Sequence, residues 1–406
     1  MTQSIADCSM RAVDHFAGAD AEVLPGRQLA AIREAAPSFK DWLRSTGMPG
    51  FLGSCDLIAL PYPRRFALWR SSRSPAPFVR IFNRMIVVQW REPTSAEGDT
   101  GEPTSAEGDD HGSAGGEPEA PQPRGSTRVR TLLIEPTEHD LAANTPYFAA
   151  MEKRLPRLRS VSVAVHGTVE AHLRRLGIAP DEVDYITFDH LHTQDLRRWL
   201  GTTRPQPDLV ALGKVPGGAP GEPVEPYFPN ARLLVMREEW TQLAERMLHP
   251  LQKDWYQVAT YSDLRTDKVV LLDGDTQVGP GVALMRTPGH SVGNHSVVLN
   301  TSSGIWTSSE NGVHAECYTP ERSRILGVAA HARSSGAEVV LNGNTIELTA
   351  WQYNSMVKEK LVADRGGPGG EWVQHFPSSE LTPWAGSPGT SPSFTWGTIS
   401  HGLLLH

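Results

Sequence analysis

Residues 287–296, TPGHSVGNHS, place two histidines around a tight turn between two apolar runs. The run before the turn, GVALMR, and the run after it, SVVLN, have the composition of buried strands. A Pro-Gly turn directs the next side chain sharply away from the sheet axis. We therefore expect His290 to project from the end of one strand, with His295 at the start of the next.

A second pair of histidines stands in FDHLHTQD, residues 188–195. The run YITF predicts a strand, so His190 and His192 fall where the chain leaves that strand. In an extended segment, residues i and i+2 point to the same side. The two imidazoles can then reach one ion, a geometry that suits zinc or iron. An HxH pair alone does not distinguish ligands from coincidence, so the assignment depends on the other stretches.

An acidic residue ends a third apolar run. In GIWTSSENG, residues 304–312, the predicted strand stops just before Glu310. Glu310 can therefore offer a carboxylate to the same ion as the histidines.

The order of these pieces resembles the metallo-β-lactamase superfamily. That order is HxH after a strand, then TPGH-x-x-GNHS, then an acid after an apolar strand. The stretches RTLLIEP at 130–136 and GTVEAHLRRLGIAPDEVDYITF at 167–188 also resemble the elements that frame the family's first metal motif. The resemblance covers about residues 50–350. It implies an α+β fold, an αββα sandwich of the metallo-β-lactamase type.

The resemblance implies that His190, His192 and His290 form an intact three-histidine metal site. A water would take the fourth position, which is the open coordination that catalysis needs. Glu310 falls where the family has a bridging aspartate and is one methylene longer. It is expected either to bridge to a second ion or to orient the water.

Ligands of the family's second metal are largely missing. Gln194 stands where the pattern has an aspartate, and Asp195 where it has a histidine. The stretch EVVLNGNT lacks the family's late histidine and offers Asn342 and Asn344 instead. Asp195 and Glu310 remain as ligands for a second ion, helped by weak amide ligands. We therefore expect one zinc ion rather than two, with iron or manganese as alternatives.

The other histidines carry no partner motif. Three of them could complete the second site from elsewhere in the chain, although a structural role is expected for each: His314, His331 and His401. Six more are expected to be ordinary surface or capping residues: His15, His111, His139, His249, His375 and His406.

The resemblance implies a metal-dependent hydrolase that acts on an ester, lactone, thioester or amide bond of a small-molecule substrate. A metal ion lowers the pKa of bound water from about 15.7 to about 7 and so supplies hydroxide at neutral pH. Asp195 or Glu310 is expected to hydrogen-bond this hydroxide and to carry its proton to the leaving group. His295 is expected to stabilise the oxyanion or, as the TPGH turn favours, to support the ligands.

Two other functions stay open at this point. His190, His290 and Glu310 could form the two-histidine, one-carboxylate site of an iron oxygenase. Alternatively, the missing ligands could mark a non-catalytic binding or scaffold protein. The intact three-histidine set argues against this last alternative.

Substrate choice is expected to come from loops over the metal. The candidates are the Pro/Gly-rich residues 202–230 and the C-terminal tail. Four aromatic residues could line a pocket there or pack equally well in the core: Tyr227, Phe228, Trp255 and Tyr256.

Charge and cysteine content argue against certain classes of partner and of site. The net charge of −8 is local, because residues 92–119 hold nine carboxylates and no Lys or Arg. The rest of the chain has 37 acidic and 38 basic residues, which gives no electrostatic case for nucleic acid. The three cysteines are scattered, which argues against a disulfide framework and a thiolate zinc site.

Neither a signal peptide nor an apolar run of the roughly 18 residues that span a bilayer is visible. A cytoplasmic protein without a membrane partner is therefore expected, and the oligomeric state stays open.

Changes in composition and apolar pattern along the sequence predict three regions. Residues 1–50 predict a helical extension, 51–365 the sandwich domain, and 366–406 an irregular tail rich in Gly, Pro and Trp. Within the sandwich domain, residues 92–125 predict a disordered acidic insertion, because EPTSAEGD occurs twice and almost nothing apolar surrounds it. Further strands are expected over FALWRSS and AEVVLNGN.

Overall fold

The structure is a computed structural model that describes residues 10–93, 127–156, 162–215, 218–343 and 345–406. The acidic insertion predicted at 92–125 lies outside the described residues, except for its first two, which end a strand. Asn344 and His111 also lie outside them.

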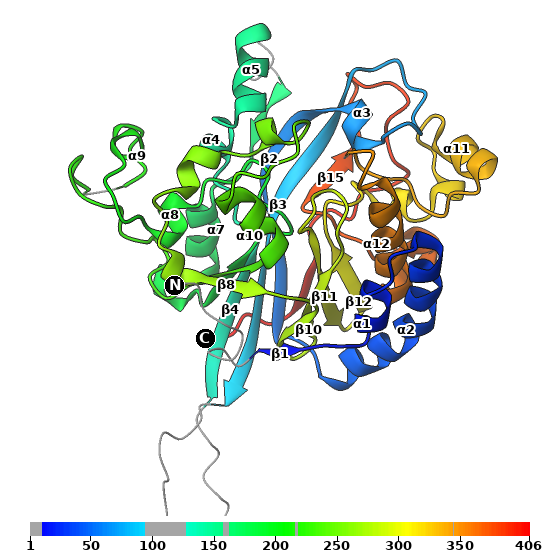
Figure 1. Cartoon of the computed structure of the whole chain (residues 1–406), viewed down its shortest axis with the longest axis horizontal. Coiled ribbons are helices and arrows are strands. Elements are labelled where there is room, and N and C mark those ends of the chain that lie inside the picture. Colours follow the sequence, from blue (N-terminus) through cyan, green and yellow to red (C-terminus); the bar gives the residue numbers. More distant parts are fainter. Residues whose placement is uncertain (1–9, 94–126, 157–161, 216–217, 344) are drawn as a thin grey trace, which may run out of the picture.

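Two sheets face each other at the centre of the fold (Figure 1). The larger has nine strands in the order β16-β2-β3-β4-β6-β7-β8, with β15 beside β3 and β5 beside β2. These strands are β2 (Phe51–Pro63), β3 (Phe78–Pro93), β4 (Thr127–Ile134), β5 (Ala164–Val165), β6 (Tyr185–Thr187), β7 (Arg232–Met236), β8 (Val269–Leu272), β15 (Ser379–Thr382) and β16 (Ser400–Gly402). Because β4, β6, β7 and β8 run parallel, their C-terminal ends lie at one edge of the sheet.

The smaller sheet has five antiparallel strands in the order β1-β9-β10-β11-β12. They are β1 (Arg11–Ala12), β9 (Thr276–Gly279), β10 (Val282–Arg286), β11 (His295–Thr301) and β12 (Gly304–Ser308). Arg286 pairs with His295, so the TPGH turn closes the β10–β11 hairpin as the sequence predicts. A separate ribbon joins β13 (Arg365–Gly366) to β14 (Trp372–Val373).

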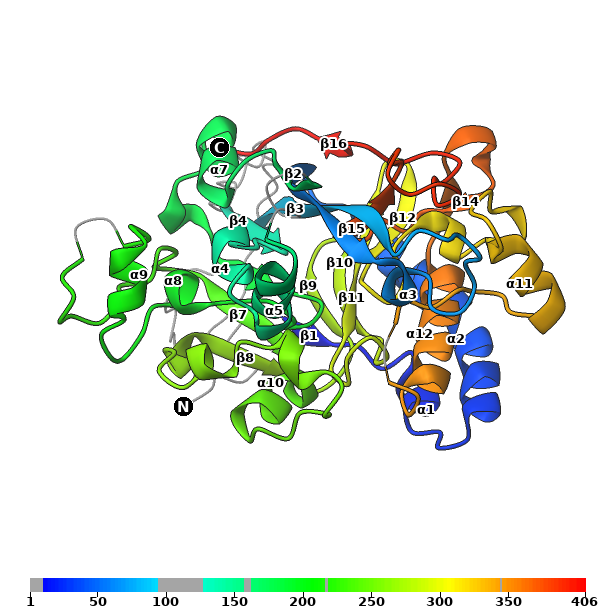
Figure 2. The same cartoon turned by 90° about the horizontal axis from the view of Figure 1, so that it is seen from above.

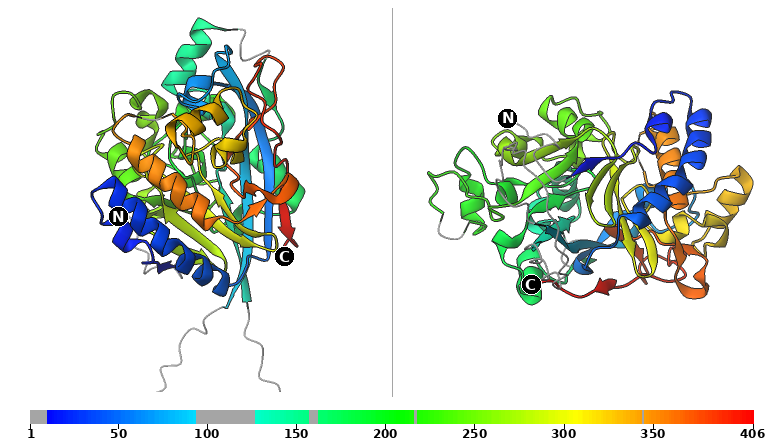
Figure 3. Two further views of the ribbon diagram at one scale, coloured as in Figure 1. Left: turned by 90° about the vertical axis from the view of Figure 1, so that its right-hand side faces the viewer. Right: turned by 90° about the horizontal axis from the view of Figure 1, so that it is seen from below.

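Helices cover the outer face of each sheet, which gives the four layers of the expected αββα sandwich (Figures 2 and 3). The larger sheet is covered by α7 (Val169–Leu176), α8 (Arg197–Leu200) and α10 (Arg237–Ala244). The smaller is covered by α1 (Ala17–Asp20), α2 (Pro25–Ser45) and α12 (Thr349–Val362). The other α-helices in the described part of the chain are α3 (Arg64–Ala67), α4 (His139–Ala142), α5 (Pro146–Arg154), α9 (Pro207–Ala211) and α11 (Val328–Ser335).

Alternating side chains explain the layers. In β10, Val282 and Leu284 pack between the sheets, whereas Ala283 and Met285 pack against the helices on the outer face. Such burial contributes roughly 1.5–3 kcal/mol for each large aliphatic side chain, so the pattern fixes which face of each strand turns inward.

Several expected elements differ from the observed ones. FALWRSS forms the end of α3 and a turn rather than a strand. Residues 337–343, the described part of AEVVLNGN, are held by isolated bonds, such as Val340 N–H to the carbonyl of Cys317, rather than by a ladder. The α12 helix was not predicted. The C-terminal tail is not merely irregular, because β15 and β16 pair with β3 and β2. Among the described residues, no helix combines the length and apolar content that a bilayer span needs.

Candidate metal centre

Three histidines meet where two loops leave the sheets. His190 and His192 follow β6, and His290 lies in the turn between β10 and β11. One ring nitrogen from each lies within 4.8 Å of the others, and all three residues are buried. Within the described parts of the chain, this is the one group of His, Cys, Asp or Glu side chains with such spacing. The structure thus brings together the three histidines that the sequence singles out as metal ligands.

The hydrogen-bond partners of the three histidines distinguish their two ring nitrogens. His190 Nδ1 lies 2.6 Å from Asp189 Oδ1, so Nδ1 carries the proton that this carboxylate accepts and Nε2 is left for an ion. His192 Nδ1 and His290 Nε2 lie only 3.2 Å apart. Three convergent imidazole nitrogens are a donor set that fits zinc, so these three residues would hold the ion.

Electrostatics keep two of the three histidines neutral. Burial, followed by the charge on His190, lowers the pKa of His192 well below its ordinary value. The same two causes lower the pKa of His290 to about 3. For His190, burial alone would lower the pKa, but the charge and hydrogen bond of Asp189 outweigh burial and raise it to about 9. Neutral imidazole is the form that binds metal, so His192 and His290 are already prepared for an ion.

Asp189 links several parts of the site. Its Oδ1 accepts from His190, and its Oδ2 accepts from the backbone N–H of Glu310 at 2.5 Å. Its own N–H donates to Glu135 Oε1 at 2.6 Å. Burial, and then the charge of Asp189, raise the pKa of Glu135 well above its ordinary value. Metal-binding histidines are commonly oriented by a carboxylate in this way.

Glu310 lies on the cavity wall beside the histidines but outside their cluster. Its carboxylate accepts from Ser378 Oγ at 2.9 Å. Burial, and then the charge of Asp189, raise the pKa of Glu310. Its separation from the cluster removes support for the iron site made of His190, His290 and Glu310.

Asp195 is placed differently from the expectation. Its two carboxylate oxygens accept from Arg197 Nε and Nη2 at 3.0 and 2.7 Å, and it does not line the cavity. The expectation that Asp195 binds a metal or carries a proton is therefore not supported, because Arg197 occupies its carboxylate. Gln194 does line the cavity, but its amide donates to Thr137 Oγ1 at 3.2 Å.

The other proposed replacements also have structural partners. Asn342 donates to the carbonyl of Glu310 at 3.0 Å and accepts from the N–H of Gly343. His314 bonds to the carbonyl of Phe394 at 2.9 Å. His331 lies on α11 and His401 on β16, and neither lines the cavity. None of these side chains offers a ligand atom to the three-histidine cluster.

His295 is fully buried and does not line the cavity. Its backbone N–H donates to the backbone carbonyl of Asp189 at 2.9 Å, and its ring Nε2 lies 3.0 Å from Thr187 Oγ1. Burial lowers its pKa to about 4. These contacts suit a residue that supports the loop carrying His190 and His192. They do not place His295 where it could contact a substrate oxyanion.

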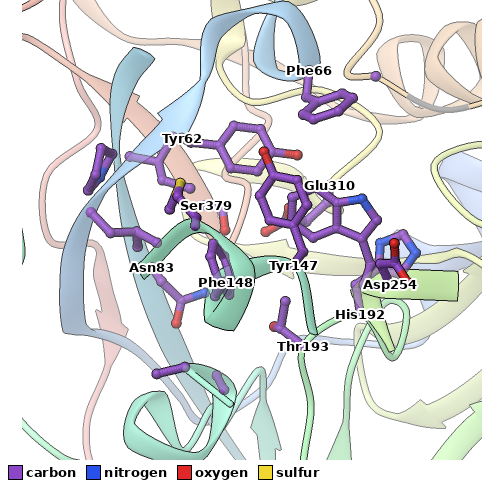
Figure 4. A pocket seen from close by; sticks show the side chains of 18 of the residues that line it. Tyr62, Phe66, Asn83, Tyr147, Phe148, His192, Thr193, Asp254, Glu310 and Ser379 are labelled. Atoms are coloured by element: carbon purple, nitrogen blue, oxygen red, sulfur yellow. The ribbon is translucent and has the colours of Figure 1, made fainter. Parts of the chain in front are cut away.

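A cavity of about 1050 Å³ opens onto the histidines. Figure 4 shows aromatic side chains from several elements around it, together with His192 and Glu310. Trp255 contacts three of the lining rings. Its ring centroid lies 3.9 Å from that of Tyr147, on which it stacks, and 5.7 and 5.8 Å from those of Phe66 and Phe148, to which it is edge-on. Of the four aromatics singled out from the sequence, Trp255 lines the cavity, whereas the other three do not: Tyr227, Phe228 and Tyr256.

Sequence reasoning missed three residues of interest. Asp189 precedes the first histidine, and its contact with His190 depends on a bend at these residues that strand periodicity does not predict. His139 is buried, lines the cavity and has an Nε2 without a hydrogen-bond partner. His375 is fully buried, with its Nε2 between the carbonyls of Ser309 and Gly312. His139 and His375 are thus not the ordinary surface residues that were expected.

No protein-family model matches the sequence. Among similar solved structures, an N-acyl homoserine lactone lactonase has 15% identity and a TM-score of 0.38, covering 74% of this chain and 94% of its own. An AiiA variant from B. thuringiensis with N-decanoyl-L-homoserine bound has 15% identity and a TM-score of 0.39, covering 74% and 95%. AidC, a dizinc quorum-quenching lactonase, has 10% identity and a TM-score of 0.42, covering 88% and 96%.

The chain resembles the metallo-β-lactamase superfamily in fold. The features that carry this resemblance are the four αββα layers and the order of the HxH and TPGH motifs along the chain.

Proposed function

We propose that this chain is a metal-dependent hydrolase with one metal ion, acting on an ester, lactone, thioester or amide that carries a large apolar group. The observation that carries the proposal is the convergence of three buried histidines in an aromatic cavity of about 1050 Å³. Sites of this kind combine an apolar wall with a few polar groups that fix the substrate.

Support for a single ion comes from the residues at the second-metal positions. Asp195 is held by Arg197, the Gln194 amide is bonded to Thr137, and Asn342 is bonded to the backbone of Glu310. Each of these side chains therefore has a structural partner in place of a metal.

A zinc ion bound at this site would supply a nucleophilic water at neutral pH. Residues of the chain supply orientation and proton transfer. Asp189 fixes the ring of His190, and Glu310 offers a carboxyl on the cavity wall whose raised pKa suits it to take up and return a proton. The rings around Trp255 bury the apolar group of the substrate and exclude water from the reacting bond.

The test is hydrolysis of p-nitrophenyl butyrate and p-nitrophenyl decanoate by the full chain, before and after chelation. We expect chelated protein to lose activity, one equivalent of zinc to restore it, and decanoate to be favoured. The His192→Ala variant should be inactive with zinc present. Undiminished activity in thoroughly chelated protein, or in folded H192A, would contradict the proposal.

A further inference from the structure

Glu239 connects the two loops that carry the histidines. It lies in the first turn of α10 and is fully buried. Its Oε1 accepts from the N–H of Leu191, the residue between His190 and His192, at 2.9 Å. Its Oε2 accepts from Ser291 Oγ, directly after His290, at 2.7 Å. One carboxylate therefore holds both ligand-bearing loops.

Three further donors complete the shell of this carboxylate. The N–H of Gly293 and the amide of Gln242 donate to Oε2 at 3.3 and 2.8 Å. The hydroxyl of Tyr256 donates to Oε1 at 2.9 Å. Burial, and then the charge of Glu239, raise the pKa of Tyr256 well above its ordinary value, so its hydroxyl keeps the proton that it donates. A buried carboxylate with this many donors is held in one geometry.

The turn that carries His290 packs closely against α10. A Cβ placed on Gly293 would lie 2.2 Å from the backbone nitrogen of Glu239, so only glycine lets the turn approach α10. On the other side, a Cβ on Gly289 would lie 2.5 Å from the Cα of Gln352 in α12. The turn that carries His290 is thus held between α10 and α12, and Glu239 ties it to the HxH loop.

We propose that Glu239 is a positioning residue that sets the distance between His190 and His192 on one loop and His290 on the other, and so sets the affinity of the site for its metal. The inference rests on the proposed metal site. Acidic residues in a first helical turn commonly stabilise the helix itself. Here the carboxylate accepts from both ligand loops, which a role in helix stability alone does not require.

Glu239→Gln tests this role, because an amide has one acceptor oxygen where the carboxylate has two. Whichever way the amide turns, its NH₂ faces the donors of one loop. We expect the zinc dissociation constant, measured against a chelating dye, to rise roughly 10- to 100-fold. The visible spectrum of the cobalt-substituted protein should also lose intensity, because its ligands leave tetrahedral geometry.

Glu316→Gln is the matched control. Glu316 is fully buried and also joins two loops, through Ser323, the N–H of Arg324 and the N–H of Ser393, but it does not line the cavity. E316Q should lose stability and keep the wild-type zinc affinity. An equal loss of zinc affinity in E316Q would show general loosening of the fold and overturn the proposal.

Ser291→Ala is a milder second variant, in case E239Q does not fold. It removes one donor to Glu239 and should weaken zinc binding in the same direction, by roughly tenfold. Wild-type affinity and an unchanged cobalt spectrum in folded E239Q, or in S291A if E239Q is unfolded, would overturn the role of Glu239 while leaving the proposed function intact. Absence of zinc binding by the wild-type chain would overturn the metal site, and this role with it.

Discussion

Asp189 and His190 are adjacent in sequence and hydrogen-bonded side chain to side chain, with Oδ1 of Asp189 2.6 Å from Nδ1 of His190. This contact engages Nδ1 of His190, which leaves Nε2 as the nitrogen available to an ion. Asp195 stands where the family pattern has a histidine, and its carboxylate accepts from Arg197 instead. Support for the metal therefore comes from the residue before the HxH motif rather than from those after it.

The first prediction concerns this carboxylate. Asp189→Asn should weaken zinc binding roughly 10- to 100-fold, because the amide cannot accept from both His190 and the N–H of Glu310 as a carboxylate does. Asp195→Asn is the control. It breaks the buried ion pair with Arg197 and should lower the melting temperature while leaving zinc affinity unchanged. Zinc titration of both variants distinguishes the two carboxylates, and the reverse ranking would refute this assignment.

The second prediction concerns the turn that carries His290. Gly293→Ala puts a methyl group against the backbone of Glu239, so the turn must move away from α10. We expect both the melting temperature and the zinc affinity to fall. Gly274→Ala is the control, since a Cβ there meets no atom within 4 Å. Equal zinc affinities for G293A and G274A would argue against a close-packed turn as the source of ligand geometry.

The third prediction concerns the aromatic cavity. Trp255→Ala removes the ring that stacks on Tyr147 and contacts Phe66 and Phe148. Aromatic pairs contribute about 0.5–1.5 kcal/mol beyond burial, so kcat/KM for p-nitrophenyl decanoate should fall roughly two- to tenfold. The loss should be smaller for the butyrate ester. Trp351→Ala, at an exposed position outside the cavity lining, should change neither value. Equal losses on the two esters would show that Trp255 does not contact the apolar group.

The fourth prediction concerns pH. Burial lowers the pKa of His375 from 6.5 to about 3 in the folded chain. Between these values the unfolded chain binds a proton at this histidine and the folded chain does not, so stability falls as pH falls from about 6.5 towards 3. The contribution of one such group approaches about 1.4 kcal/mol per pH unit. Urea unfolding of wild type and His375→Asn across this range should show a shallower dependence in the variant, and identical slopes would contradict the assignment.

Much of this architecture follows from the sequence because apolar periodicity sets which face of each strand is buried. The β10–β11 hairpin and the three histidines follow from the TPGH and HxH motifs. What the sequence missed depends on contacts between distant segments. Glu239 in REEW gives no local sign that it bonds to residues 191 and 291, and β15 in the tail is defined by its pairing with β3. FALWRSS has strand composition, yet it forms the end of α3 and a turn after β2.

The most direct test of the central claim is the number of metal ions per chain, measured by elemental analysis of full-length protein purified with zinc and without chelator. The account predicts one zinc ion per wild-type chain, one in Asp195→Asn, and none in folded His192→Ala. Two ions in the wild type, with one lost in D195N, would contradict the single-metal site. Less than a tenth of an ion in the zinc-supplied wild type would contradict the metal centre altogether.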